Sequence, residues 1–186
     1  MKAKRKALVL VICAVLLTCS AVSGTLAYMF DRETKLNTFA IGRIGIDLSE
    51  TTGFSYKMTP GSALRKDPTV TVASGSEACW LFVELEESNN FGTFLAYAVA
   101  GGWTYLDGGV YYRQVSAADA EAGVIYSVLE GDKVTVKTTV TDKDLVSLRD
   151  ETFPTLDITA YAIQCDSNVA EASQAWAYLK SEFAGN

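Results

Sequence analysis

The chain has 186 residues with 16 basic and 22 acidic side chains and no histidine, and its formal net charge is −6 at pH 7. This acidic balance argues against nucleic acid as a partner and against adsorption to anionic lipid or wall polymer. Without histidine, the chain cannot contain an HExxH zinc site, a Ser-His-Asp triad or a Cys-His nucleophile pair.

Residues 1–27 have the three-part pattern of a secretion signal, which we expect to be helical. Basic side chains come first, residues 7–17 are apolar and uncharged, and small residues then lead to Ala27. A signal peptidase needs small side chains before the cut, so we predict cleavage between Ala27 and Tyr28 and a secreted, extracellular protein. The alternative is a retained anchor, the only membrane contact we expect, although polar residues shorten the apolar run below a full span. Residues 28–186 suit a single domain.

The first third of the mature chain has the pattern of short strands separated by turns. Apolar residues alternate along 37–50 but slip by one position at Gly42, which predicts a β-bulge there. Residues 54–58 alternate again, and the Thr-Pro-Gly sequence at 59–61 is a turn signal. A threonine-rich strand follows around 70–72.

The second half contains the most apolar strand and the clearest hairpin. Residues 79–85 are apolar on both alternating faces, which predicts a strand in the centre of a sheet. The Asp-Gly-Gly sequence at 107–109 lies between two aromatic runs and predicts a hairpin over 103–115. Apolar residues also alternate along 133–141 and 156–164, so both are predicted strands.

Two stretches have helical spacing. The first, 117–122, is short, whereas 169–183 is longer and begins after Asn168 and Glu171, which resemble a capping box. Its apolar face, typical of packing on a sheet, consists of Val169, Ala172, Trp176, Leu179 and Phe183. Together these elements predict a mainly β protein, an antiparallel β-sandwich with a C-terminal amphipathic helix.

Two cysteines, Cys79 and Cys165, remain after the predicted cleavage. An even pair in an exported protein is compatible with a disulfide. Two buried thiols on neighbouring strands are the alternative, and the sequence leaves both open.

Aromatic side chains concentrate in the predicted hairpin, at Trp103, Tyr105, Tyr111 and Tyr112. Such a group can bind sugar or protein, but it fits equally with cross-strand pairing that stabilises the hairpin. Carboxylates cluster at 84–87 and 142–144 without the spacing of a calcium loop. We therefore expect no metal site, no cofactor and no catalytic residue.

Several longer blocks stand out near the two ends of the chain. They read GTLAYMFD at 24–31, NTFAIG at 37–42 and FPTLDITAYAIQ at 153–164. These blocks resemble the TasA/camelysin family of exported proteins of Gram-positive bacteria, and the likeness covers almost the whole chain. The chain departs from the family pattern at Cys79 and Cys165 and is much shorter than TasA itself.

The resemblance implies a jelly-roll-like β-sandwich and a structural role in the biofilm matrix or at the cell surface. It also implies export through a dedicated SipW-type signal peptidase. Family members assemble into fibres when the N-terminal segment of one subunit pairs as a strand with the next subunit, or with related matrix proteins. Here the donor strand is expected at 28–39, with its apolar side chains at Tyr28, Phe30, Leu36 and Phe39.

The sequence leaves two alternative functions open. The first is a secreted binding module that uses the aromatic hairpin 103–112 for a glycan or a protein. The second is a metal-dependent hydrolase, since some members of the family are called metallopeptidases. A chain without histidine gives that second function little support, so we predict a protein that is not an enzyme.

Overall fold

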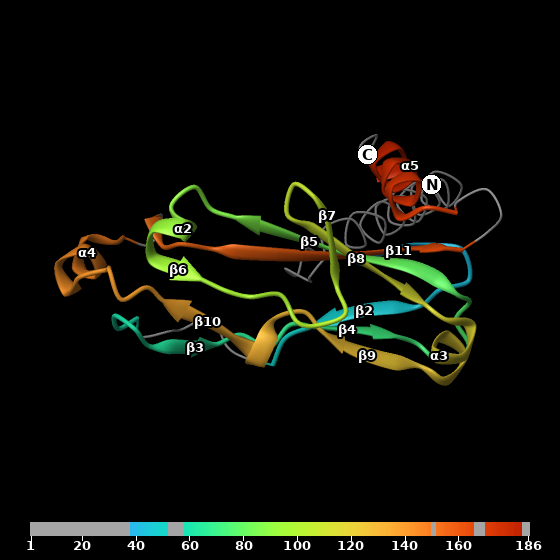
Figure 1. Ribbon diagram of the computed structural model, residues 1–186, viewed down its shortest axis with the longest axis horizontal. Coiled ribbons are helices and arrows are strands. Elements are labelled where there is room, and N and C mark those ends of the chain that lie inside the picture. Colours follow the sequence, from blue (N-terminus) through green and yellow to red (C-terminus); the bar gives the residue numbers. More distant parts are fainter. Residues whose placement is uncertain (1–37, 52–57, 150–151, 166–169, 184–186) are drawn as a thin grey trace, which may run out of the picture. The chain divides into compact units, whose positions relative to one another are not determined.

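The computed structural model describes residues 38–51, 58–149, 152–165 and 170–183 (Figure 1). It is mainly β, with three sheets of five, three and three strands and a C-terminal helix. All strand pairs are antiparallel except one. Across these four ranges, no helix has the length and apolar character needed to span a bilayer. The predicted signal, its cleavage site and most of 54–58 lie outside the described residues.

The largest sheet has the strand order β1-β11-β5-β8-β7. Its strands are β1 (Thr38–Ile41), β11 (Leu156–Gln164), β5 (Cys79–Glu87), β8 (Val110–Val115) and β7 (Thr104–Asp107). The prediction of a central strand at 79–85 is confirmed, because β5 lies third of five. The predicted hairpin is also confirmed, since β7 and β8 pair around Gly108 and Gly109.

Two three-stranded sheets complete the β structure. One has the order β2-β4-β9, formed by β2 (Ile46–Ser49), β4 (Thr69–Val72) and β9 (Val124–Ser127). The other has the order β3-β10-β6, formed by β3 (Ala63–Arg65), β10 (Lys133–Val136) and β6 (Leu95–Ala96). The predicted turn at 59–61 is confirmed, because the Ser62 N–H donates to the Thr59 carbonyl at 2.9 Å.

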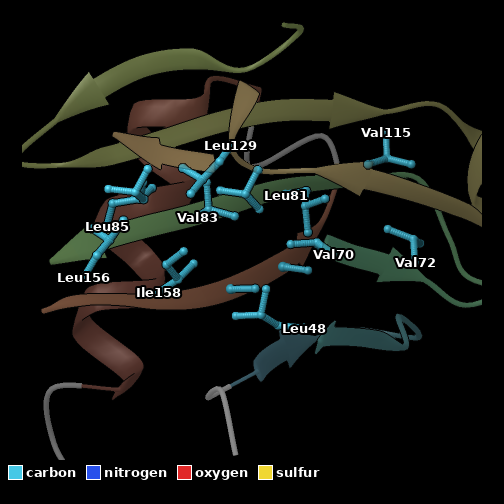
Figure 2. Close-up of a cluster of buried hydrophobic side chains, with 14 of the residues drawn as sticks. Leu48, Val70, Val72, Leu81, Val83, Leu85, Val115, Leu129, Leu156 and Ile158 are labelled. Carbon is cyan, nitrogen blue, oxygen red and sulfur yellow. The ribbon is translucent and has the colours of Figure 1, made fainter. Parts of the chain in front are cut away.

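The core follows from the two apolar faces of β5. Leu81, Val83 and Leu85 point into a large cluster with Leu48, Val70 and Val72 of the β2-β4-β9 sheet, as Figure 2 shows. The other face of β5, with Trp80 and Phe82, belongs to a second cluster with residues of the C-terminal helix. Both small sheets therefore cover one face of the large sheet, and the helix covers the other (Figure 1).

Four α-helices and one short 3-10 helix occur in the described ranges. They are α2 (Phe91–Phe94), α3 (Ala117–Ala122), η1 (Glu130–Asp132), α4 (Asp142–Ser147) and α5 (Ala172–Phe183). The predicted helix at 117–122 is confirmed, and its N-terminus is capped by Ser116, which accepts from the Asp119 N–H. The apolar face of α5 is confirmed at Ala172, Trp176 and Leu179, all buried against the sheet. Val169 and Asn168 lie outside the described residues.

Two predictions about strands were wrong. The slip at Gly42 is not a bulge, because β1 and β2 belong to different sheets and the chain crosses between them at this glycine. The predicted strand 133–141 ends at Val136, because the chain turns at 137–140, where the Val140 N–H donates to the Lys137 carbonyl at 3.2 Å, and a helix follows. In that helix, α4, Thr141 and Asp144 form a capping box that competes with an extended conformation.

Candidate functional site

The outer edge of β11 is only partly paired in the described part of the chain. β5 pairs with all nine residues of β11 on one side, whereas β1 pairs with only four on the other. This second pairing is the parallel one and places Thr38 opposite Ala160 and Ile41 opposite Ile163. Within the described part of the chain, no strand pairs with the outer edge of 156–159.

Aromatic rings hold β1 on this edge. Phe39 stacks on Tyr161 of β11, with ring centroids 5.4 Å apart, and contacts Phe183 of α5 at 4.6 Å. Ile41 packs on the same side, against the cluster beneath α5. Thr38 and Ala40 point the other way and are exposed, so β1 is anchored mainly through one face.

Tyr161 is itself fixed by its neighbours. Its hydroxyl donates a hydrogen bond to the Glu84 carboxylate at 2.9 Å, and its ring meets Trp176 edge-on at 5.1 Å. Burial first, and then the Glu84 carboxylate, raise the pKa of Tyr161 above its ordinary value. The phenol therefore stays neutral and presents a rigid ring face to Phe39.

Of the predicted donor-strand residues, the structure describes only Phe39. Tyr28, Phe30 and Leu36 lie outside the described residues, as does Ala27 of the predicted cleavage site. Phe39 lies in β1, paired with β11 of its own domain.

The structure separates the four aromatic residues of the hairpin. Tyr105 and Tyr111 form a cross-strand pair with centroids 5.3 Å apart, and Tyr105 is 59% exposed. Tyr112 lies on the opposite face, where it packs against Trp80 and Phe82 beneath α5. The four side chains therefore do not form one continuous patch.

Trp103 belongs to a different arrangement that the sequence did not reveal. Its indole N–H donates to the Ser127 carbonyl at 2.9 Å, and Arg113 lies over its ring at 4.9 Å. The same guanidinium lies over the ring of Tyr126 on β9, 3.8 Å from its centroid. Burial lowers the pKa of Arg113, and Tyr126 opposes this shift. Arg113 thus joins the large sheet to the β2-β4-β9 sheet by cation–π contacts. The sequence pattern does not predict the contact between Arg113 and Tyr126, because it depends on how two sheets pack.

The two mature cysteines lie close together but on opposite faces of the large sheet. Cys79 is buried in the larger core cluster, whereas Cys165 packs at the margin of the cluster under α5. Both are thiols in the described chain, and burial raises the pKa of Cys79 to about 12. Side chains that point to opposite faces cannot be bridged without backbone movement. Cys79 is the buried strand thiol of the second alternative, whereas Cys165 lies just past the end of β11 and is only partly buried, so the disulfide stays a prediction.

The carboxylate clusters have structural roles. Glu84 accepts from Tyr161, while Glu87 is the hydrogen-bond partner of Tyr97 on the other face of β5. Asp144 caps α4 by accepting from the backbone and the hydroxyl of Thr141. Within the described residues, no group of three His, Cys, Asp or Glu side chains is placed to hold a metal ion.

Comparison with family models, curated proteins and solved structures gives no match to this chain.

Proposed function

We propose that this chain is a secreted structural protein of the cell surface or biofilm matrix that assembles by β-strand addition. The observation that carries the proposal is the outer edge of β11, where β1 covers only 160–163 and leaves 156–159 open in the described chain. An open edge is a template for an extended peptide, because main-chain hydrogen bonds supply affinity and side-chain pockets supply specificity.

The register of β1 supports the predicted donor segment 28–39. Thr38 lies opposite Ala160 and Ile41 opposite Ile163 in a parallel pair, so the end of that segment is already an extended strand suited to the β11 edge. A donor strand from a neighbouring subunit in this register covers β11 from Leu156 to Ile163. The strand is available outside the cell because the predicted cut after Ala27 releases its N-terminus.

The family assignment and the finer fold class belong to the same proposal. We take the domain to be a jelly-roll-like β-sandwich of the TasA/camelysin type, cut by a SipW-type signal peptidase. Support comes from the two small sheets that cover one face of the large sheet, and from the sequence blocks at 24–31 and 153–164. Mass spectrometry of the secreted protein tests the cleavage site, and an N-terminus other than Tyr28 would contradict it.

Electron microscopy and sedimentation of purified domains test the assembly. We expect residues 28–186 to form fibres and residues 38–186, which retain all of β1, to remain monomeric. A third protein, with the sequence of 28–37 scrambled, controls for the length of the extension and should also stay monomeric. The proposal fails if the first protein is monomeric at all concentrations, or if all three assemble equally.

The aromatic hairpin favours a second candidate, a secreted binding module. Tyr105 is the most exposed aromatic side chain among the described residues, and Trp103 lies on the same face of the hairpin. Binding of a glycan or wall fragment that is lost in both Tyr105→Ala and Trp103→Ala would support this function. Binding that survives both changes would reject the site. In either case we propose a protein without cofactor or enzymatic activity.

A further inference from the structure

Arg113 differs from the other arginines of the described chain in the partners of its guanidinium. Arg43 and Arg65 each pair with a carboxylate, at 2.9 and 3.2 Å, and Arg149 donates to three backbone carbonyls at the end of α4. The guanidinium of Arg113 contacts two aromatic rings but has no hydrogen bond or ion pair among the described residues. Stacking on rings uses the face of a guanidinium, so its N–H edge stays available for an anion.

The surrounding residues fix the position of this guanidinium. Its central carbon lies 3.8 Å from the ring centroid of Tyr126 and 4.9 Å from that of Trp103. These two rings meet edge-on, with centroids 6.4 Å apart, so the guanidinium lies in a corner between them. Gly102 lies against it as well, because a Cβ atom at this glycine would collide with Nη2 of Arg113. Since the side chain is already held in place, little conformational entropy is lost when an anion binds.

The corner is half-buried and open to solvent on one side. Arg113, Trp103 and Tyr126 are each partly exposed. Burial lowers the pKa of Arg113 and only Tyr126 opposes this shift, so no carboxylate of the described chain compensates for the desolvated charge. A guanidinium binds a carboxylate through two parallel N–H···O bonds, which are strongest where water is partly excluded. A carboxylate is therefore the ligand group that this corner fits best.

An exposed aromatic ring lies on the same face of the hairpin, one rung away. Tyr105 is paired with Tyr111, which precedes Arg113 by two residues, so these three side chains share a face. The two rungs are separated by about 6–7 Å, twice the rise per residue of a strand. One pyranose ring spans this distance, with its C–H face on the 59%-exposed Tyr105 and its carboxylate on Arg113. A peptide carboxylate has no ring that would cover Tyr105.

We infer that Arg113 binds the carboxylate of an acidic sugar, a uronic acid residue whose ring stacks on Tyr105. The inference is independent of strand addition and rests on the second candidate function, for which it names the ligand class and the residue that determines specificity. The formal charge of −6 disfavours long polyanions, so we expect a short oligosaccharide held at one carboxylate.

Isothermal titration calorimetry of residues 28–186 with three probes tests this inference. The probes are a galacturonic acid trisaccharide, its methyl ester, which has the same rings without charge, and triglutamate, which has carboxylates without sugar rings. We expect the acidic trisaccharide to bind about 10- to 100-fold more tightly than its ester, the range typical of a hydrogen bond to a charged group. Triglutamate is expected to bind as weakly as the ester.

Two arginine variants show whether Arg113 is responsible. Arg113→Gln and Arg43→Gln remove the same charge, but Arg43 belongs to an exposed ion pair with Glu77. We expect the first variant to bind the acid only as weakly as the ester, and the second to bind it like the unmodified chain. Arg113→Lys, which keeps the charge but loses the paired N–H geometry, repeats the test if the glutamine variant does not fold.

Each result decides the matter. A preference for the acid that is lost in Arg113→Gln and kept in Arg43→Gln supports the site. Equal binding of acid and ester overturns it, and leaves the second candidate function standing if Tyr105→Ala removes that binding. Tight binding of triglutamate that depends on Arg113 overturns the sugar as ligand in favour of an acidic peptide. If no probe binds, the inference fails, while assembly is judged separately by the fibre experiment.

Discussion

Gly42 has a backbone conformation and surroundings that glycine fits better than any other residue. It ends β1 with φ of +105°, a conformation that side chains other than glycine rarely adopt. A Cβ atom at this position would lie 2.8 Å from the Cβ and 2.7 Å from the Oε1 of Gln164. We therefore predict that Gly42→Ala destabilises the domain by loosening β1 from the end of β11.

The size of the effect follows from three contributions. Placing alanine in a left-handed conformation costs about 1–2 kcal/mol. The contact with the Gln164 Cβ adds to this, because that atom is not the far end of a flexible side chain. The reduced entropy of the unfolded chain offsets about 0.4–1 kcal/mol. We expect a net loss of about 1–3 kcal/mol in the free energy of unfolding.

Urea denaturation of residues 38–186, followed by circular dichroism, measures this loss in a protein that we expect to be monomeric. Gly92→Ala is the matched control, since Gly92 lies in α2 without a positive φ and a Cβ there meets no atom within 4 Å. We expect the control to be neutral or slightly stabilising. A Gly42→Ala variant as stable as the control would refute the reasoning about the β1 turn.

Three further predictions concern the two clusters. Trp176→Ala removes a buried ring beneath α5, and we expect urea denaturation to show a loss of about 3–5 kcal/mol; a loss below 1 kcal/mol would contradict the packing. Arg113→Lys keeps the charge but loses the flat guanidinium above Tyr126, so we expect unfolding to become easier by about 0.5–2 kcal/mol, and unchanged stability would refute the contact. Because burial raises the pKa of Cys79 to about 12 from 9.0, its stabilising contribution is complete below pH 9 and is lost as pH rises toward 12. A thiol reagent at pH 8 is expected to modify Cys79 only after unfolding, and rapid modification in the folded domain would contradict this burial.

Strong local patterns allowed much of the fold to be predicted. The strand 156–164 was predicted with the bounds that β11 has, because its small and branched residues alternate without interruption. The central position of β5 followed from its two apolar faces. The capping residues Thr141 and Asp144 were also visible in the sequence, and they indicate why the predicted strand 133–141 was too long.

Which strands pair with one another could not be predicted from local sequence patterns. Whether Gly42 marks a bulge or a crossing depends on which sheet each flanking strand joins, and alternation alone carries no such information. The same limit applies to the contacts of Phe39 with Tyr161 and Phe183, because the three rings come from separate elements. The hairpin was predicted from local turn chemistry, but the partners of Trp103 depend on the second sheet.

The parallel pairing of β1 with β11 joins the first described strand of the domain to the last. If the chain is exported N-terminus first, as we propose, β1 emerges long before its partner β11. Non-local pairings of this kind form late, because a long loop must close first. In the assembly that we propose, this interval would let β1 meet the β11 edge of a neighbouring chain before its own.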